Sequence, residues 1–328
     1  MTMHTYAAPH FLTIDQFQPR EFQDLLSLSQ QMRWLSKTAQ PLAGQTVVLF
    51  FEKPSLRTRV TFEVAVRRLG GWPVLLGRED EKLGDRESIP DMARNLSLWV
   101  DGIVARVFSH AALNELATFS SVPVVNALSD YEHPCQALAD MITLADVWES
   151  FGDRTVVYVG DWNNVSRSLW KACGLSGLNF RAVCPVQYGP AAGEQVTWSS
   201  DPKDVAGADA IYTDTWASMG QEQELETRRR VFEPYQVNEH LLSQTGKPTL
   251  FMHCLPAHRG LEVTDAVIDS ERSLVFQQAA NRLPAEMAVL ISLLERSNEG
   301  THQEGRAGVL RRPGYFDHHS VAQRKLRV

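Results

Sequence analysis

A group of cationic and hydroxyl side chains follows an apolar run in the first quarter of the chain. The stretch "FEKPSLRTRVTFEVAVRRLGG" covers residues 51–71 and places Lys53 and Arg57 beside Ser55 and Thr58. A helix that begins here has unpaired N–H groups and a partial positive charge in its first turn. Together with hydroxyls and a bidentate guanidinium, this end of a helix suits a phosphate group. A serine that caps an ordinary basic helix explains the same residues, so both interpretations stay open at this point.

Apolar runs alternate along the chain with stretches of helical spacing. "QTVVLFF" (45–51) predicts a strand, and residues 57–71, 88–100 and 133–151 predict helices. The other runs that we interpret as strands are "WPVLLG", "DGIVARV", "VPVVNAL", "TVVYVGD", "FRAVCP", "AIYTDTW", "TLFMHCL" and "LVFQQ". Continuous apolar strands separated by helices indicate parallel sheets covered on both faces, with ligands beyond the carboxyl ends of the strands. We therefore predict an α/β fold with two doubly wound domains, joined by long interdomain helices.

The length of 328 residues exceeds what one core usually needs, so two domains are expected. We place the first domain at residues 1–150 and the second at 151–285. Residues 286–297 are predicted to form a helix that returns to the first domain. The segment 298–328 is rich in Gly, Arg and His and poor in periodic apolar residues, so we expect a flexible tail or a surface extension.

The bulk composition argues against several classes of partner. The net charge is −7 and the pI about 5.8, which argues against general nucleic-acid binding. The first residues lack the pattern of an export signal, and no apolar run is long enough to span a bilayer, so no membrane partner is expected. The cysteines are scattered and without CxxC spacing, and we expect free thiols in the cytoplasm; they are Cys135, Cys173, Cys184 and Cys254.

Cofactor sites find little support in the sequence. "GDWNNV" follows an apolar run but has one Gly where a dinucleotide fingerprint has three. His253, Cys254 and His258 lack the second pair of ligands that a structural zinc site needs. His253 and Cys254 are also adjacent on an expected strand, and so point to opposite faces rather than forming a nucleophile–base pair. We expect no cofactor and no metal, and we interpret the run Arg228–Arg230 as a solvated helix face.

The opening stretch resembles the carbamoyl phosphate signature of the aspartate and ornithine carbamoyltransferase family. The resemblance continues in order over roughly residues 10–295, through "ARVFSH", "HPCQALAD", "YVGDWNNV", "TDTWASMGQE", "HCLPAHRGLEV" and "NRL". It implies that the first domain binds carbamoyl phosphate and that the second binds the amine. It also implies a homotrimer, or a multiple of trimers, as the assembly.

The resemblance assigns carbamoyl phosphate contacts to Ser55, Leu56, Arg57, Thr58, Lys82, Arg106, His133, Gln136, Cys254, Leu255 and Arg282. Leu56 stands where many relatives have Thr, so only its backbone N–H can contribute. Lys82 is either a phosphate contact supplied to a neighbouring subunit or a solvated lysine. Arg106 and His133 would donate to the carbonyl oxygen, and Gln136 would accept from the carbamoyl NH₂. The structural alternatives are that Arg106 is a salt-bridged surface residue and that His133 caps the long helix.

The same resemblance assigns the amine side. Asp214 and Cys254 match the pair that contacts the side-chain amine, and Asn164, Ser218 and Met219 match the groups that hold the amino-acid end. The catalytic set implied is Arg57, Arg106, His133, Asp214 and Cys254, with Cys254 as a positioning group rather than a nucleophile.

The paired asparagines and the "SMG" motif favour L-ornithine as the amine, with L-citrulline and phosphate as products. Acetylornithine or putrescine as the amine, and a non-catalytic binding relative, are the alternatives. Trp162 stands where relatives usually have Gly, and we expect its indole either to cover the substrate or to narrow the pocket.

Overall fold

The computed structural model describes residues 8–76, 82–217 and 224–304, and it contains two parallel β-sheets. The strands are β1 (Thr46–Phe51), β2 (Trp72–Leu76), β3 (Gly102–Arg106), β4 (Val124–Leu128), β5 (Thr155–Val159), β6 (Asn179–Val183), β7 (Trp198–Ser199), β8 (Ala210–Thr213) and β9 (Leu250–His253). The first sheet has the order β2-β1-β3-β4 and the second β7-β6-β5-β8-β9. Every neighbouring pair is parallel, which confirms the predicted class of fold.

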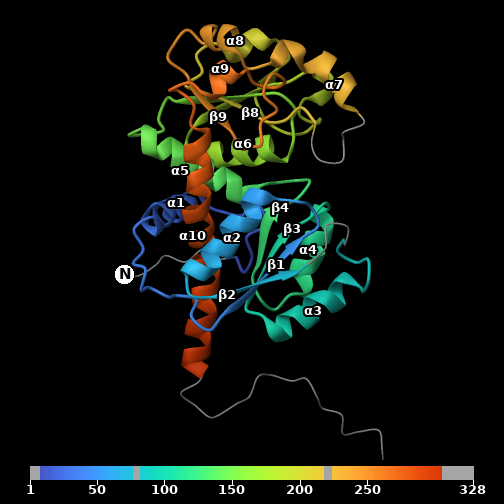
Figure 1. The fold of residues 1–328 in the computed structure, drawn as a ribbon, viewed down its shortest axis with the longest axis vertical. Coiled ribbons are helices and arrows are strands. Elements are labelled where there is room, and N and C mark those ends of the chain that lie inside the picture. The colour runs from blue at the N-terminus through green and yellow to red at the C-terminus, as the bar shows by residue number, and fades with distance from the viewer. Residues whose placement is uncertain (1–7, 77–81, 218–223, 305–328) are drawn as a thin grey trace, which may run out of the picture. The chain divides into compact units, whose positions relative to one another are not determined.

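Helices connect the strands in chain order (Figure 1). They are α1 (Pro19–Met32), α2 (Leu56–Arg68), α3 (Ile89–Trp99), α4 (His110–Phe119), α5 (Pro134–Val147), α6 (Asn164–Ser176), α7 (Leu225–Phe232), α8 (Glu239–Ser243), α9 (Asp265–Ile268) and α10 (Val275–Glu304). Short polar side chains begin several of them. Ser55, Ser88 and Ser109 each accept a hydrogen bond from a backbone N–H in the first turn of α2, α3 and α4.

The first sheet is covered on both faces because its strand residues alternate between two cores. Val47 and Leu49 pack into a core with α2, α5 and α10, whereas Val48 and Phe50 pack against α3 and α4. The second sheet has the same construction around Tyr158 on one face and Val157 on the other. This two-sided burial explains why the strands are apolar without a polar alternation.

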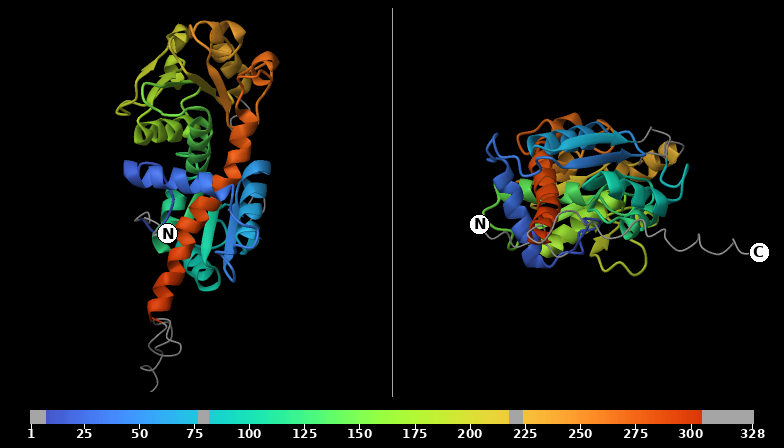
Figure 2. Two further views of the ribbon diagram at one scale, coloured as in Figure 1. Left: turned by 90° about the vertical axis from the view of Figure 1, so that its left-hand side faces the viewer. Right: turned by 90° about the horizontal axis from the view of Figure 1, so that it is seen from below.

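One hydrophobic core is shared by the two sheets. It includes Val47 and Leu49 from the first sheet and Val156 and Tyr158 from the second, with α5 packed between them. Helix α10 adds apolar side chains from Ala285 to Leu294, and Figures 1 and 2 show it running past both sheets. Residues up to Glu295 form one compact unit that contains both sheets. The predicted connection by long helices is confirmed, whereas the exact domain limits stay a prediction.

One predicted strand is wrong. "LVFQQ" (274–278) is not a strand but the start of α10, which begins at Val275. The N–H of Leu274 donates to the Phe251 carbonyl, and Ser273 forms a single bridge to Phe251. The chain then turns into a helix, because the apolar run continues with the helical spacing of α10. In short apolar segments, the period alone does not separate a buried strand from the start of a helix.

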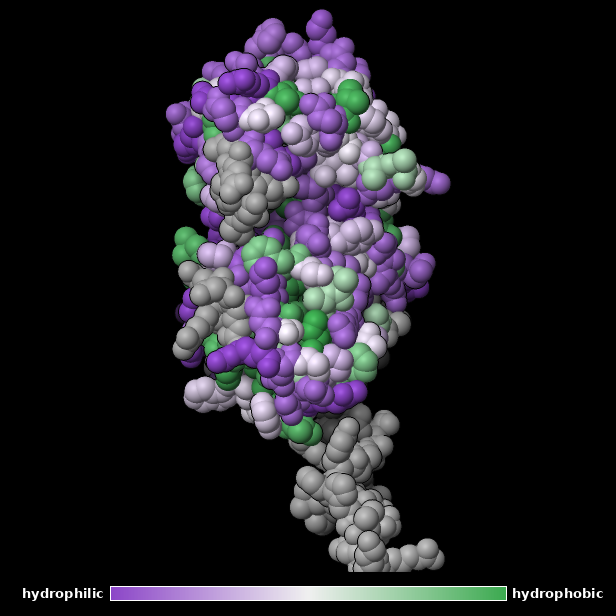
Figure 3. Space-filling model, turned by 90° about the vertical axis from the view of Figure 1, so that its right-hand side faces the viewer, coloured by the Kyte–Doolittle hydropathy of each residue, from purple (hydrophilic) through white to green (hydrophobic). Residues whose placement is uncertain are grey.

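Apolar side chains are exposed mainly over one part of the first sheet and its helices. They include Leu56, Val60, Trp72, Val74, Leu75, Leu76, Leu98 and Trp99, from α2, β2 and α3. The face of the molecule in Figure 3 is mainly hydrophilic, with hydrophobic side chains gathered in its lower half, where the first sheet lies. No helix in the described ranges is both long and apolar enough to cross a bilayer.

Candidate active site

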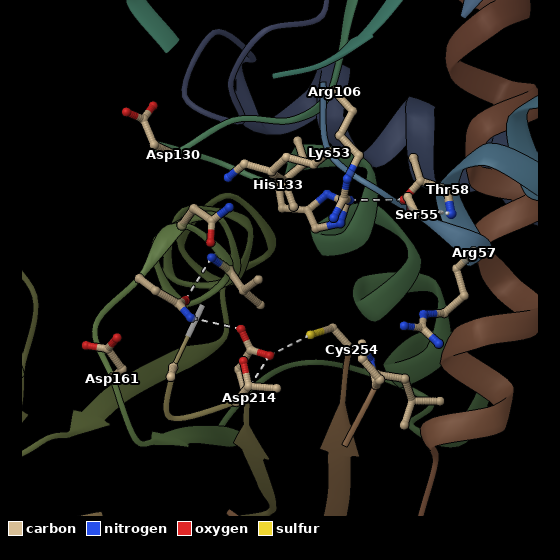
Figure 4. Close-up of a pocket in the computed structure, with 18 of the residues that line it drawn as sticks. Lys53, Ser55, Arg57, Thr58, Arg106, Asp130, His133, Asp161, Asp214 and Cys254 are labelled. Atoms are coloured by element: carbon tan, nitrogen blue, oxygen red, sulfur yellow. Dashed lines mark hydrogen bonds between the residues drawn. The ribbon is translucent and has the colours of Figure 1, made fainter. Parts of the chain in front are cut away.

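A cavity of about 1130 Å³ lies at the carboxyl ends of strands from both sheets. The predicted site residues that line it are Ser55, Leu56, Arg57, Thr58, Arg106, His133, Asn164, Asp214, Cys254, Leu255 and Arg282. Gln136 and Lys82 are not part of its wall, and Ser218 and Met219 lie outside the described residues. Figure 4 shows Ser55, Thr58, Arg106 and His133 on one side, and Asp214 with Cys254 facing them.

The opening motif forms the end of β1 and the start of α2. Ser55 is the N-cap of α2, and its Oγ accepts from the Thr58 N–H at 3.2 Å. The interpretation of Ser55 as a helix cap is therefore correct, and the same residue also lines the cavity. The Leu56 side chain is 75% exposed, so any contribution to a ligand comes from its backbone. A capped helix start and an anion site thus coexist here.

Two buried guanidinium groups meet at Thr58. Arg106 Nη1 and Arg282 Nη2 donate to Thr58 Oγ1 at 3.3 and 3.0 Å. The Nε atoms of both arginines are buried and have no hydrogen-bond partner within the described residues. Burial, with Arg282 nearby, lowers the pKa of Arg106 to about 10, so it remains charged at neutral pH. Two buried positive charges with unsatisfied hydrogen-bond donors favour the binding of an anion at this position.

His133 is 4% exposed and lies directly before α5. Its side chain does not cap that helix. Its Nε2 lies 3.4 Å from Arg282 Nη1, and because a guanidinium can only donate, Nε2 accepts and Nδ1 carries the ring hydrogen. That Nδ1 has no hydrogen-bond partner among the described residues. Burial, and then Arg282, Arg106 and Arg57, hold the pKa of His133 well below its ordinary value, so the ring is neutral at pH 7.

Gln136 lies one layer behind the cavity wall. Its Oε1 accepts from Arg282 Nη1 at 2.9 Å, and its Nε2 donates to Asp140 Oδ1 at 2.8 Å. Glu286 holds the other side of the same arginine, with Oε1 2.8 Å from Arg282 Nη2. These contacts fix the guanidinium of Arg282. The direct contact predicted between Gln136 and a carbamoyl NH₂ stays a prediction.

Asp214 and Cys254 meet on the amine side of the cavity. Asp214 follows β8 and Cys254 follows β9, and these neighbouring parallel strands end at the same edge. The Cys254 thiol donates to Asp214 Oδ1 at 3.1 Å, and the Thr215 N–H donates to the same oxygen at 2.8 Å. Burial, with the Asp214 charge beside it, raises the pKa of the Cys254 thiol well above its ordinary value. The thiol is therefore protonated at neutral pH.

Asn163 is a site residue that the sequence interpretation did not assign. Its Oδ1 caps α6 through the N–H groups of Val165 and Ser166, and its Nδ2 donates to Asp214 Oδ2 at 2.8 Å. The neighbouring Asn164 instead donates to the Ser129 carbonyl at 2.6 Å. The doublet of asparagines was visible in the sequence, but only the backbone of the turn decides which side chain faces Asp214.

Three other residues are placed as follows. Lys53 lines the cavity, with Nζ 4.3 Å from the centroid of the Phe108 ring. Lys82 is exposed, and its Nζ lies 5.4 Å from the same ring. The Trp162 indole is 8% exposed and packs against Trp170, while its Nε1 donates to Glu194 at 2.7 Å. The indole is thus held in the core of the second sheet, although Trp162 contributes to the cavity wall.

One set of possible metal ligands is present in the described part of the chain. Asp214, His253 and Cys254 each bring one ligand atom within 4.8 Å of the others. A cysteine binds zinc as a thiolate, whereas Cys254 is a thiol that donates to Asp214. His253 Nδ1 already accepts from the Leu255 N–H at 2.8 Å. The expectation of no metal stays a prediction.

The cavity has buried arginines on one side and the pair of Asp214 and Cys254 on the other, and two family matches identify the class of protein. Residues 9–146 match the aspartate/ornithine carbamoyltransferase carbamoyl-P binding domain, and residues 152–293 match the Asp/Orn binding domain of the same family. The chain belongs to the aspartate/ornithine carbamoyltransferase family.

Individual relatives within this family are named ornithine carbamoyltransferases. An ornithine carbamoyltransferase from Shewanella oneidensis is 45% identical over 298 residues, which is 87% of this chain and 99% of that protein. One from Thermus thermophilus is 46% identical over 282 residues, covering 84% of this chain and 94% of that protein. Among solved structures, the ornithine carbamoyltransferase from Pyrococcus furiosus superposes with a TM-score of 0.83 at 42% identity, covering 88% of this chain and 98% of that chain.

Proposed function

We propose that this protein transfers the carbamoyl group of carbamoyl phosphate to the δ-amine of L-ornithine, giving L-citrulline and phosphate. One observation carries the proposal. Three arginines, Arg57, Arg106 and Arg282, line the same cavity as the hydrogen-bonded pair of Asp214 and Cys254. Such a cavity complements a dianion at one end and a cationic amine at the other.

The phosphate end accounts for the leaving group. The helix start at Ser55, together with Arg57 and Arg106, would bind the phosphate oxygens as charge-assisted hydrogen bonds. The N–H at His133 Nδ1 would donate to the carbamoyl oxygen, where negative charge develops as the amine attacks. A neutral imidazole suits this role, because it still donates one hydrogen.

The amine end accounts for the nucleophile. The δ-amine attacks the carbamoyl carbon only after its ammonium has lost a proton, because a protonated amine has no lone pair. The new C–N bond forms as the C–O bond to phosphate breaks, and the proton lost by the attacking amine leaves with the phosphate as HPO₄²⁻. Asp214 would orient the amine, and the Cys254 thiol would fix Asp214 without forming a covalent intermediate.

The amino-acid end of ornithine is assigned by the resemblance to Asn164, Ser218 and Met219. Asn164 now bonds the Ser129 carbonyl. A contact with ornithine would therefore require this side chain to exchange or share that bond.

A homotrimer, or a multiple of it, belongs to the proposal. Strand β2 is the edge of its sheet and exposes apolar side chains, with Trp72 67% exposed. Natural edge strands usually carry charge or a cover, so an apolar edge supports contact with another copy of the chain. Lys82 is exposed, with its Nζ near the Phe108 ring, and in such an assembly it would supply a phosphate contact to a neighbouring subunit; a solvated lysine is the alternative. A cytoplasmic location also belongs to the proposal, and the free state of all four cysteines supports it.

Carbamoyl transfer by the purified protein, measured as phosphate release and as the carbamoylated product, tests the proposal. Carbamoyl phosphate is supplied with L-ornithine and, in parallel, with N-acetyl-L-ornithine, putrescine or L-aspartate. The expected result is turnover with ornithine alone. Turnover with another amine would overturn the choice of ornithine, and no turnover with any amine would favour a binding protein.

A further inference from the structure

Arg228 is buried, although the sequence places it in a run of three arginines that was interpreted as a solvated helix face. Its side chain is 6% exposed, whereas the Arg230 side chain on the same helix is 80% exposed. Arg229 is exposed as well. Burying the guanidinium of Arg228 costs free energy unless charged or polar groups pair with it. The contacts of Arg228 show how it is paired.

The guanidinium of Arg228 makes three hydrogen bonds. Nη1 donates to Asp161 Oδ2 at 2.8 Å and to the Trp216 carbonyl at 2.9 Å. Nε donates to Glu224 Oε2 at 2.9 Å. The group also lies 4.6 Å from the centroid of the Tyr188 ring. The Asp161 side chain is 11% exposed, so this pair is largely withdrawn from water.

These contacts tie together two turns that carry the amine side of the cavity. Asp161 belongs to the turn after β5, two residues before Asn163, whose amide bonds Asp214. Trp216 belongs to the turn after β8, two residues after Asp214 itself. A single guanidinium therefore bonds both segments that hold the carboxylate of Asp214.

Among the described residues, the phosphate side of the cavity has no comparable link to Arg228. Arg106 and Arg282 are fixed by Thr58, Gln136 and Glu286. The bonds of Arg228 go to Asp161, Trp216 and Glu224 instead. Loss of its guanidinium should therefore disturb one half of the cavity and leave the other in place.

We propose that Arg228 is a positioning residue for the amine half of the cavity, which it preorganises by holding Asp161 and the Trp216 carbonyl in register. The inference rests on the proposed transfer to ornithine and names a residue of the cavity wall that sets ornithine affinity by holding the contact groups in place. Lysine should replace it only in part, because one ammonium cannot reproduce the bonds of Nη1 to Asp161 and the Trp216 carbonyl together with the bond of Nε to Glu224.

The test compares Arg228→Gln with Arg229→Gln, its exposed neighbour on α7. The KM for ornithine of Arg228→Gln is expected to rise about tenfold or more, because a buried charged hydrogen bond is lost. The KM for carbamoyl phosphate is expected to stay within about twofold, and Arg229→Gln is expected to match the wild type in both constants. A rise in both KM values of Arg228→Gln by the same factor, or in neither, overturns the inference.

Two further variants, Asp161→Asn and Arg228→Lys, keep the test decisive if Arg228→Gln does not fold. Asp161→Asn should reproduce the selective rise in the KM for ornithine. The double variant with Arg228→Gln should raise this KM by less than the product of the two single fold-changes, because both substitutions remove the same pair. If Arg228→Gln does not fold, Arg228→Lys decides: a selective rise in the ornithine KM supports positioning. Failure of Arg228→Lys to fold as well overturns the inference in favour of a purely structural role.

The outcome for the proposed function is read separately. If the wild type makes no citrulline, the proposed function fails and this inference fails with it. If the wild type is active and Arg228→Gln is unchanged, only the inference fails.

Discussion

The Cys254 thiol donates a hydrogen bond to Asp214 Oδ1 across 3.1 Å, at the point where two adjacent parallel strands end. Asp214 also accepts from Asn163 and from the Thr215 N–H. The carboxylate is thus oriented from three sides before any amine binds. Because the thiol is the donor in this arrangement, its chemistry is that of a hydroxyl rather than that of a thiolate nucleophile.

Cys254→Ser should therefore retain most of the activity. A serine hydroxyl keeps a donor for Asp214, and we expect kcat/KM for ornithine to fall by about two- to tenfold, the range for one altered hydrogen bond. Steady-state kinetics with ornithine varied at saturating carbamoyl phosphate measures this. Cys254→Ala, which removes the donor, serves as the comparison and should lose more. A loss of about four orders of magnitude in the serine variant would instead indicate covalent catalysis.

Arg57 should bind carbamoyl phosphate, whereas Arg59 on the same helix should not. Arg57 lines the cavity and Arg59 is exposed. We expect Arg57→Gln to raise the KM for carbamoyl phosphate about ten- to a hundredfold, because a charged hydrogen bond to phosphate is lost. Arg59→Gln is the matched control, with an unchanged KM. Equal effects of the two substitutions would show that only the general positive charge of α2 matters.

Asn163 has two functions that substitution can separate. Asn163→Ser keeps an N-cap for α6 but removes the donor to Asp214. We expect a fall of about tenfold in kcat/KM for ornithine with nearly unchanged thermal stability. Asn163→Ala should lose the same activity and, in addition, about 1 kcal/mol of stability through the missing cap. Full activity of the serine variant would mean that Asp214 needs no support from Asn163.

His133 should make the folded protein sensitive to acid. Its pKa in the folded state lies well below the ordinary value of 6.5, because the ring is buried among Arg282, Arg106 and Arg57. The unfolded chain therefore binds a proton below about pH 6.5 that the folded protein does not. The stability linked to His133 is complete above that pH and is lost, at up to about 1.4 kcal/mol per pH unit, as the pH falls.

Thermal unfolding of the wild type and of His133→Asn between pH 5 and 8 measures this linkage. The stability of the wild type relative to the variant should decrease as the pH falls below 6.5. A difference that stays constant over this range would show that His133 binds a proton as readily in the folded state as in the unfolded one.

The fold could be predicted because most strands, including β1, β3, β4, β5 and β8, are buried and read as continuous apolar runs. The run at 274–278 was predicted wrongly, because the start of a buried helix has the same composition as a strand, and the two-residue strand β7 was not predicted. The groups at strand ends were also predictable, since parallel strands bring Asp214 and Cys254 to one edge.

The direction of individual side chains could not be predicted. Nothing in "RRR" distinguishes Arg228 from Arg229, because the buried acceptors of Arg228 lie 67 residues away at Asp161 and on a backbone carbonyl. In the same way, the sequence left open whether the indole of Trp162 covers the substrate or narrows the pocket; Trp162 lines the cavity, and its N–H donates to Glu194, which lies 32 residues later in the chain. Contacts between distant segments decide these cases, and local sequence patterns do not contain them.

The position of Arg282 on α10 has a consequence for the synthesis of the protein. Arg282 completes the phosphate site by bonding Thr58, 224 residues earlier in the chain. A nascent chain that has been translated as far as β9 already contains all the strands of both described sheets. It does not yet contain Arg282. The first domain can thus emerge and begin to fold while its anion site is still incomplete. The complete anion site therefore requires α10 to be synthesised and packed against the first sheet.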